Sequence, residues 1–378
     1  MATATRDYLG RPATDQRRGQ LSRRLHIDLP LLVALVALCA VGLVVLYSAS
    51  GQDLDTVARQ GVRMLLALTV MLALAQVSPD TLEHWSPWLF GLGMVLLIAV
   101  LAFGDVGKGA QRWLDLGLFR FQPSELMKVA VPAMIAWFFA DATLPPTAPR
   151  LFAGILLALA PTLLIAKQPD LGTALLIASS GFFVLLFAGM RWRLVGAVIL
   201  LLSALAPIIW HNMHDYQRRR VLTFLNPEND PLGAGYHIIQ SKIAIGSGGL
   251  YGKGWLNGTQ SHLDFLPERS TDFIFAVFSE EFGFLGVALL LSLYAFIVVR
   301  GLYIATQAQD TFGRLVCGSI TLTFFVYVLV NVGMVSGLLP VVGVPLPMVS
   351  YGGTSIVTLM AAFGILMSVH THRRLIAT

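Results

Sequence analysis

The feature that most constrains this chain is a series of apolar runs, each long enough to cross a membrane. A membrane-spanning helix needs about 17 to 25 predominantly apolar residues. Only 12% of the 378 residues are charged and 56% are hydrophobic, whereas a soluble domain carries about 25% charged residues. The sequence therefore predicts an all-α, polytopic membrane protein with about ten transmembrane helices, near residues 31–47, 57–77, 88–104, 123–139, 150–166, 171–189, 194–210, 273–299, 315–336 and 354–370.

The distribution of lysine and arginine predicts the orientation of the chain. An even number of spans places both termini on one side of the membrane. Of the 26 Lys and Arg residues, 13 fall on the side of the termini, and 7 lie on the other side outside the longest loop. Short cytoplasmic loops carry the excess of these residues, so we expect both termini to be cytoplasmic.

We expect a single domain over residues 1–378, with a cytoplasmic tail at 1–27 and one large extracytoplasmic loop at 211–270, between the seventh and eighth helices. This loop is the longest polar interruption of the apolar pattern, and it carries Arg218 and Lys242. Binding and catalytic residues often lie on loops, so a basic loop at the water edge of a bilayer is a candidate functional region. Both cysteines lie within apolar spans, so no disulfide framework or thiolate metal site is predicted.

Ionisable side chains inside the predicted spans locate a cavity, because such groups usually face a bundle interior or a water-filled space. Arg59 and Arg63 are four residues apart, on one face near the outer end of the second helix. Snorkelling to lipid phosphates is the alternative for this pair. Glu125 and Lys128 are three residues apart at the outer end of the fourth helix, where a purely structural ion pair is the simpler interpretation.

Other polar residues lie near the outer ends of the spans. Arg112 and Trp113 offer a guanidinium that can bind phosphate through two N–H groups and an aromatic face that suits a sugar, although interfacial tryptophan is also common. Asp170 and Asp272 precede the sixth and eighth helices, where either carboxylate could serve only as a cap or a favourable charge at the helix end.

Two segments are harder to accommodate in a membrane. Glu280 and Glu281 lie about 12 to 14 Å deeper than Asp272 at the helical rise per residue, so at least one carboxylate must be neutralised, protonated or paired. Residues 338–353 are apolar but broken by three prolines, so they cannot span as a regular helix. We expect this segment to lie at or dip into the outer interface, in contact with lipid or a partner.

A basic cavity with carboxylates and an aromatic plate suits an anionic ligand with an apolar tail, such as a lipid-linked phosphate. No Walker or Rossmann glycine motif occurs, which argues against a nucleotide motor. One candidate is an enzyme acting on this lipid from the outer face, with a carboxylate base and basic groups holding a diphosphate. The other is a flippase or transporter, which should carry polar groups near the midplane and on both sides. The outward clustering favours the enzyme.

Five segments together resemble the SEDS family of peptidoglycan glycosyltransferases, and they extend from the third helix to the tenth. They are GAQRWLDLGLFRFQPSELMK (109–128), KQPDLGTAL (167–175), the loop sequence 216–254, PERSTDFIFAVFSEEFG (267–283) and NVGMVSGLLPVVGVPLPMVSYGGTS (331–355). Within them, the segment at 260–273 resembles the elongation branch of the family more than the division branch.

The resemblance implies a polymerase of lipid II, the undecaprenyl-diphosphate-linked disaccharide pentapeptide. Such an enzyme makes β-1,4-linked glycan outside the bacterial cytoplasmic membrane during cell elongation. The resemblance also implies a class B penicillin-binding protein, similar to penicillin-binding protein 2, as partner, along with other elongation proteins and no nucleic acid. We expect this partner to dock on the eighth and ninth helices and on the proline-rich loop 338–347. A scaffold without activity is a third alternative.

The family's functional residues map onto positions already singled out. The resemblance implies that Asp272 is the family's essential loop aspartate. It also implies that Glu125 and Lys128 are the charged pair of the fourth helix, and that Arg112 and Trp113 are the pair at the membrane interface. Asp170 also lies in a family motif. Asp272 would then accept the proton of the acceptor 4-hydroxyl, while Arg112, Lys128 and either Arg59 or Arg63 offset the diphosphate charge. The motif supplies no ligand set that identifies a divalent cation, so the cofactor stays open.

Overall fold

Each of the ten predicted spans is a helix in the computed structural model. The structure describes residues 26–107, 110–115, 120–212, 218, 222–224, 226, 228, 234–259 and 268–372. The prediction of an all-α polytopic membrane protein is confirmed. The ten helices are α2 (Leu29–Ala49), α3 (Leu54–Ala75), α4 (Pro79–Phe103), α5 (Pro123–Ala140), α6 (Ala148–Lys167), α7 (Leu171–Phe187), α8 (Trp192–Asn212), α12 (Ile274–Thr306), α13 (Thr311–Val335) and α14 (Thr354–Thr371). Within the described residues, seven of these helices are long and apolar enough to cross a membrane. Helices α7 and α8 hold shorter apolar runs, and α5, which is in neither group, carries the Glu125–Lys128 pair.

Two features of the fold lie outside the predicted spans. Helix α10 (Ala234–Ser247) forms within the long segment between α8 and α12. Strands β1 (Asp105–Gly107), β2 (Ala110–Asp115) and β3 (Arg120–Phe121) form a small antiparallel sheet between α4 and α5. Strand β2 is its centre, pairing Asp105 with Trp113 on one side and Leu114 with Phe121 on the other. This sheet holds the Arg112–Trp113 dipeptide close to the start of α5.

The helix ends follow local capping chemistry. The Asp28 side chain accepts a hydrogen bond from the backbone N–H of Leu31 (3.0 Å), as the sequence predicts for the first span. Helix α4 begins nine residues before the predicted span, at Pro79, because Ser78 caps it and proline suits the first helical turn. Its first turns are polar, so the apolar pattern does not reveal them.

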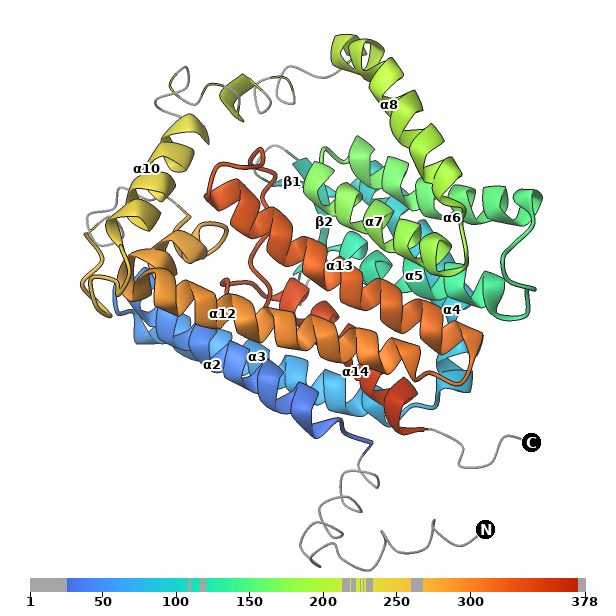
Figure 1. Cartoon of the computed structure of the whole chain (residues 1–378), viewed down its shortest axis with the longest axis horizontal. Helices are drawn as coiled ribbons and strands as arrows, with labels where there is room; N and C mark the ends of the chain where they lie inside the picture. The colour runs from blue at the N-terminus through green and yellow to red at the C-terminus, as the bar shows by residue number, and fades with distance from the viewer. Residues whose placement is uncertain are drawn as a thin grey trace, which may run out of the picture.

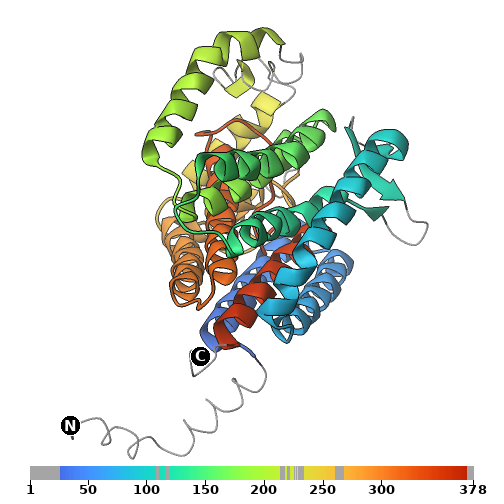
Figure 2. The ribbon, with the colours of Figure 1, turned by 90° about the vertical axis from the view of Figure 1, so that its right-hand side faces the viewer.

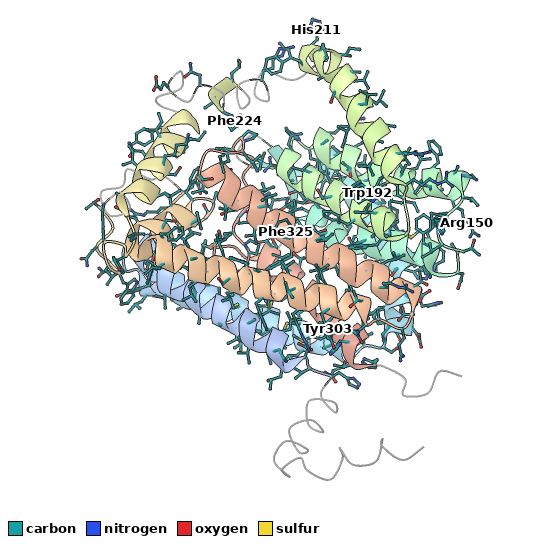
Figure 3. The ribbon with its side chains drawn as sticks, viewed as in Figure 1. Arg150, Trp192, His211, Phe224, Tyr303 and Phe325 are labelled. Atoms are coloured by element: carbon teal, nitrogen blue, oxygen red, sulfur yellow. The ribbon has the colours of Figure 1, made fainter. Side chains whose placement is uncertain are left out.

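Helix α13 lies in the middle of the bundle and packs against α5, α7 and α12. Around this centre α14 packs on α3, α4 on α5, and α6 on α7. Figure 1 shows α12 and α13 side by side, and in both Figure 1 and Figure 2 helix α8 projects away from the other helices. Large apolar side chains such as Trp192, Tyr303 and Phe325 are exposed on the outside of the helices (Figure 3), as expected for a surface that faces lipid.

Both described ends of the chain lie together. The rings of His26 and His372 stack with their centroids 3.8 Å apart. Beside them the buried carboxylate of Asp28 accepts hydrogen bonds from both Nε (3.1 Å) and Nη2 (2.6 Å) of Arg300. These contacts join the start of α2 to the ends of α12 and α14, in agreement with an even number of spans.

The proline-rich segment 338–353 is the main correction to the predicted architecture. We expected it to lie at or dip into the outer interface, in contact with lipid or a partner. Leu338 is 74% exposed, but Val344, Leu346, Met348 and Val349 are buried. Its carbonyls bond inward, since Tyr294 donates to Pro347 O (2.6 Å). Gly42 and Gly172 make room for the segment, because a Cβ at either position would lie within 2.8 Å of a carbonyl oxygen of Met348 or Val342. The part of the segment from Val344 to Ser350 lies inside the bundle, where its backbone groups find partners.

Helix α12 is interrupted at Gly283, whose φ of 64° is outside the helical range. The loop after α10 fills this interruption: Lys253 N donates to Glu280 O (3.0 Å), and Phe284 N donates to Gly249 O (2.9 Å). Three glycines permit the close approach, since a Cβ at Gly248 or Gly252 would lie 2.1 Å from a carbonyl oxygen of α12, and one at Gly283 would lie 2.2 Å from Gly252 N. The segment between α8 and α12 is therefore joined to the first turns of α12.

Candidate functional site

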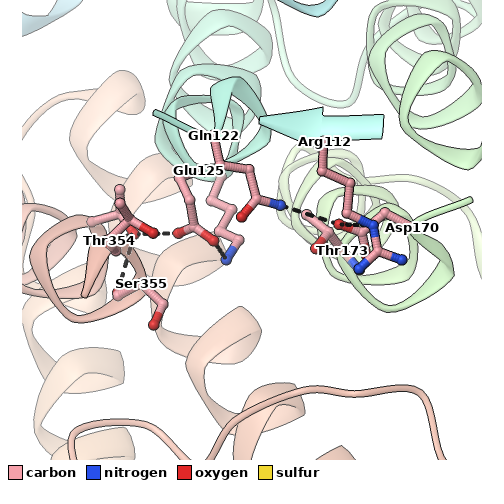
Figure 4. A network of polar contacts seen from close by, with 9 residues as sticks. Arg112, Gln122, Glu125, Asp170, Thr173, Thr354 and Ser355 are labelled. Carbon is pink, nitrogen blue, oxygen red and sulfur yellow. Dashed lines mark hydrogen bonds and ion pairs between the residues drawn. The ribbon is translucent and has the colours of Figure 1, made fainter. Parts of the chain in front are cut away.

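A polar cavity of about 230 Å³ lies at the end of the bundle where α5 and α7 begin. Its walls come from five parts of the chain: β2, α5, α7, α13 and the segment from Gly343 to Ser355. Five of the predicted site residues line it together, namely Arg112, Trp113, Glu125, Lys128 and Asp170. Figure 4 shows most of this polar network at close range, with Gln122 between Glu125 and Asp170.

Glu125 and Lys128 form a nearly buried ion pair on the first two turns of α5. Lys128 Nζ donates to Glu125 Oε1 at 2.5 Å, and the other carboxylate oxygen accepts from Thr358 of α14 (2.8 Å). Lys128 Nζ also lies 5.3 Å from the ring centroid of Tyr327, close enough for a cation–π contact. The carboxylate and the aromatic ring together hold the ammonium group at the cavity wall.

Arg112 and Asp170 form the second charged pair of the cavity. Arg112 Nη2 donates to Pro169 O (2.6 Å), and its Nε lies 3.7 Å from Asp170 Oδ2. Asp170 is also the N-cap of α7, where it accepts from Thr173 N at 3.3 Å, and Gln122 donates to it at 3.2 Å. The capping role that the sequence left open for Asp170 is thus combined with a position in the cavity.

Asp272 lies beside the cavity rather than in the cap of α12. The N-cap position belongs to Phe273, and among the described residues it receives no side-chain capping bond. Asp272 Oδ2 is 3.5 Å from the point where a Cβ on Gly343 would lie, and Gly343 lines the cavity. The Asp272 carbonyl accepts a hydrogen bond from Asn331 Nδ2 (2.9 Å). The carboxylate therefore adjoins the wall that contains Gly343.

The four other basic residues predicted for the site lie in different places. The Arg63 guanidinium lies 4.9 Å from the ring centroid of Tyr351. Its Nε is 3.7 Å from the point where a Cβ on Gly353 would lie, and Gly353 lines the cavity. Arg59 is exposed and contacts Thr56 and Asp53, so it is outside the cavity lining that the described residues define.

Arg218 and Lys242 are also outside that lining. Arg218 donates to the carbonyls of Trp210 and His211 at the end of α8, which is a common way for arginine to stabilise a helix end. The Lys242 side chain packs over Gly337, after the end of α13. In the described part of the chain, the basic loop therefore does not supply the cavity's cations.

The deeper carboxylates of α12 are paired, as the sequence requires. Glu280 is fully buried and accepts from Lys253 Nζ (2.7 Å), Thr259 N (2.9 Å) and Thr259 Oγ1 (3.0 Å). Glu281 accepts from Ser48 Oγ of α2. These contacts serve the junction between the loop and α12, and neither carboxylate lines the cavity described above.

Several cavity residues were not found from the sequence. Gln122 directly precedes the α5 motif, and Tyr327 lies on α13 with 1% exposure. Thr323, Tyr327 and Asn331 recur every four residues, which places three polar side chains on one face of an apolar helix. That periodicity was the available signal. Among the described residues, no group of three or more His, Cys, Asp or Glu side chains is arranged to hold a metal ion.

The geometry suits an anionic group presented from the membrane. Each cation lies beside a carboxylate, and a ligand phosphate would share the N–H donors of Arg112 and Lys128. Arginine and lysine donors at a site partly shielded from water can stabilise charge that develops during a reaction. Trp113 adds an aromatic face at the cavity mouth.

Comparisons with known proteins agree with this geometry. The model of the family described as "Cell cycle protein" (FTSW_RODA_SPOVE) matches residues 29–375. The peptidoglycan glycosyltransferase MrdB of Escherichia coli K12 is 55% identical over 355 residues, which cover 94% of this chain and 96% of that protein. The probable peptidoglycan glycosyltransferase FtsW of Geobacter metallireducens is 36% identical, over 92% of this chain and 95% of that protein.

Two solved structures share the fold. A chain from a peptidoglycan synthase complex, studied for its coordination of polymerization and crosslinking, superposes with a TM-score of 0.81 at 32% identity, covering 92% of this chain and 98% of that chain. The rod shape determining protein RodA of Thermus thermophilus gives a TM-score of 0.70 at 30% identity, covering 91% and 96%.

Proposed function

The chain belongs to the FtsW, RodA and SpoVE family of cell cycle proteins, and from this membership we propose that it is a peptidoglycan glycosyltransferase of the elongation type. Its relatives from the elongation and division branches are both named glycosyltransferases, and the MrdB relative is more similar than the FtsW relative, at 55% against 36% identity. The substrate we assign is lipid II, polymerised into β-1,4-linked glycan that maintains rod shape.

The observation that carries this proposal is the juxtaposition of Asp272 with a cation-lined cavity at one end of the bundle. Arg112 and Lys128 line the cavity, and Asp272 adjoins its Gly343 wall. A glycosyl transfer from a diphosphate needs a base for the acceptor hydroxyl and a group that stabilises the leaving diphosphate. The cavity supplies the cations, and Asp272, beside its Gly343 wall, supplies the base.

The mechanism follows from these positions. The 4-hydroxyl oxygen of the acceptor sugar attacks the anomeric carbon of the donor chain, the bond from that carbon to the diphosphate breaks, and Asp272 takes the hydroxyl proton. Arg112 and Lys128 donate to the diphosphate oxygens as their charge increases, and Arg63 is close enough to assist from the Gly353 side. Trp113 offers a surface for a sugar ring. One base suffices for a single displacement with a good leaving group.

We assign the partner to the class B penicillin-binding proteins, since a relative of this fold comes from a synthase complex that coordinates polymerization and crosslinking. The partner's membrane segment would dock on the lipid-facing surface of α12 and α13, where Leu289, Val299, Phe325 and Leu329 are exposed. The buried proline-rich segment is withdrawn from that surface, because polar substitution of Val344 would disturb the bundle itself. The protein would lie in the bacterial inner membrane with both termini in the cytoplasm.

Purified protein, reconstituted in liposomes with lipid II and its cognate penicillin-binding protein, tests the function. Wild type should produce glycan strands. Asp272→Asn keeps the size of the side chain but removes the base, so glycan synthesis should fall by about 10² or more, while insertion and partner binding persist. If wild type makes no glycan but moves lipid II between leaflets, the protein is a flippase. Near-normal synthesis by Asp272→Asn would remove Asp272 from the base role.

A further inference from the structure

We propose that Asn331 is a positioning residue for Asp272, a role that rests on the proposed function of Asp272 as the base. Asn331 lies near the end of α13 and is fully buried. Its side-chain nitrogen donates to two carbonyl oxygens, Asp272 O at 2.9 Å and Val344 O at 2.8 Å. A carboxamide nitrogen carries two hydrogens, so both are committed to these bonds.

The Asp272 backbone needs such an external tie because the regular helix begins after it. Residues 270–273 form a turn, and α12 begins at Ile274. The carbonyl of Asp272 is held by a side chain of another helix, 59 residues away in the sequence. This bond fixes the peptide unit that carries the Asp272 side chain, and a base must keep its position closely for proton transfer.

The second bond of Asn331 connects Asp272 to the cavity wall. Val344 and its neighbour Gly343 both line the cavity, and Asp272 Oδ2 lies 3.5 Å from the Cβ position of Gly343. One carboxamide therefore sets the distance between the base and the wall that a bound sugar would face. A hydrophobic residue at position 331 would remove the donor from the part-buried Asp272 carbonyl and from the buried Val344 carbonyl, which also explains a polar residue at this depth.

A parallel bond lies one residue before Asp272. Ser350 Oγ donates to Thr271 O (2.6 Å) and accepts from Leu346 N (2.7 Å), and Tyr351 N donates to Ser270 O (2.8 Å). The proline-rich segment thus aligns the turn along its length, and Asn331 acts at the residue that carries the base. This specific contact predicts an effect on turnover rather than on substrate binding.

The test is Asn331→Asp, which keeps the shape of the side chain but places an acceptor against both carbonyls. The matched control is Tyr294→Phe, which removes a buried bond to the same segment, at Pro347 O (2.6 Å), without touching Asp272. For each variant, kcat per folded molecule and KM for lipid II are measured in the polymerisation assay. Thermal unfolding of the same preparations is followed in parallel.

We expect Asn331→Asp to lower kcat at least tenfold with KM changed by less than about twofold, whereas Tyr294→Phe lowers thermal stability and leaves kcat near the wild-type value. If Asn331→Asp does not fold, Asn331→Ser is used, since its hydroxyl is too short to reach both carbonyls. Unchanged kcat, an equal loss in the Tyr294 control, or failure of both Asn331 variants to fold would overturn the positioning role. Activity of wild type and its loss in Asp272→Asn, measured in the same assay, keep that result separate from a failure of the proposed function.

Discussion

At the scale of single residues, the cavity combines cations with carboxylates that already balance them. Lys128 is paired with Glu125 and Arg112 with Asp170. A paired charge costs less free energy at a partly buried site than an isolated one. The two cations are therefore stable in the cavity and available to an anionic ligand. Arg59 carries the same charge, but it is exposed and lies near Asp53.

This difference predicts unequal effects of neutralising the two arginines. Arg112→Gln should lower the rate of lipid II use at low substrate by at least about tenfold, the scale of one charge-assisted hydrogen bond. Arg59→Gln should change it by less than about twofold. Steady-state polymerisation rates of the two reconstituted variants, normalised to folded protein, measure this. Equal losses would mean that the ligand phosphates bind elsewhere.

At the scale of elements, the loop after α10 is joined to the first turns of α12. The loop supplies N–H and C=O partners to the interrupted helix at Gly283, and Lys253 pairs with the buried Glu280. Asp272 lies eight residues before Glu280 on the same side of the interruption. The junction therefore supports the turn that carries the proposed base.

Glycine at 248 is required for this junction. A methyl group there would lie 2.1 Å from Ser279 O, so Gly248→Ala must separate the loop from α12, at a cost of about 1 to 3 kcal/mol for overpacking. Gly246→Ala is the matched control, because no atom lies within 4 Å of its Cβ position and alanine favours the α10 helix. Melting temperatures of the two purified variants should differ by several degrees. A Gly248 variant as stable as the Gly246 variant would contradict the packing.

At the scale of the whole molecule, the fold is a bundle around α13 whose outer surfaces are apolar, and the polar cavity that Arg112 and Lys128 line adjoins Asp272. The stacked rings of His26 and His372 place both described ends together. The opposite end of α12 meets the extracytoplasmic loop. A polymerase that receives lipid II from the membrane and releases glycan outside requires this polarity between the two ends.

Cysteine labelling in intact cells measures the orientation. Cys39 and Cys317 are buried, so background reaction should be low. A membrane-impermeant thiol reagent should modify a cysteine placed at Asn257, which follows the loop junction, and should spare one placed at Thr378. Modification of the second position alone would reverse the assigned topology.

The sequence by itself determined the ten helices, because burying about twenty apolar residues in lipid is decided within each segment. It also determined local features such as the Asp28 cap and the pairing of Glu125 with Lys128, where the partners are one turn apart or less. It identified Arg112, Lys128 and Asp170 as members of a site through their cost within a membrane and through the family resemblance.

Only the tertiary structure decided which of these groups meet. The proline-rich segment is inside the bundle because Asn331, Tyr294 and Gly172, from three different helices, bond to it or make room for it. Arg59 and Arg218 fall outside the described cavity lining because nearby acceptors hold their guanidinium groups. Contacts between residues tens to hundreds of positions apart depend on how whole helices pack, and no local periodicity of the sequence encodes that packing.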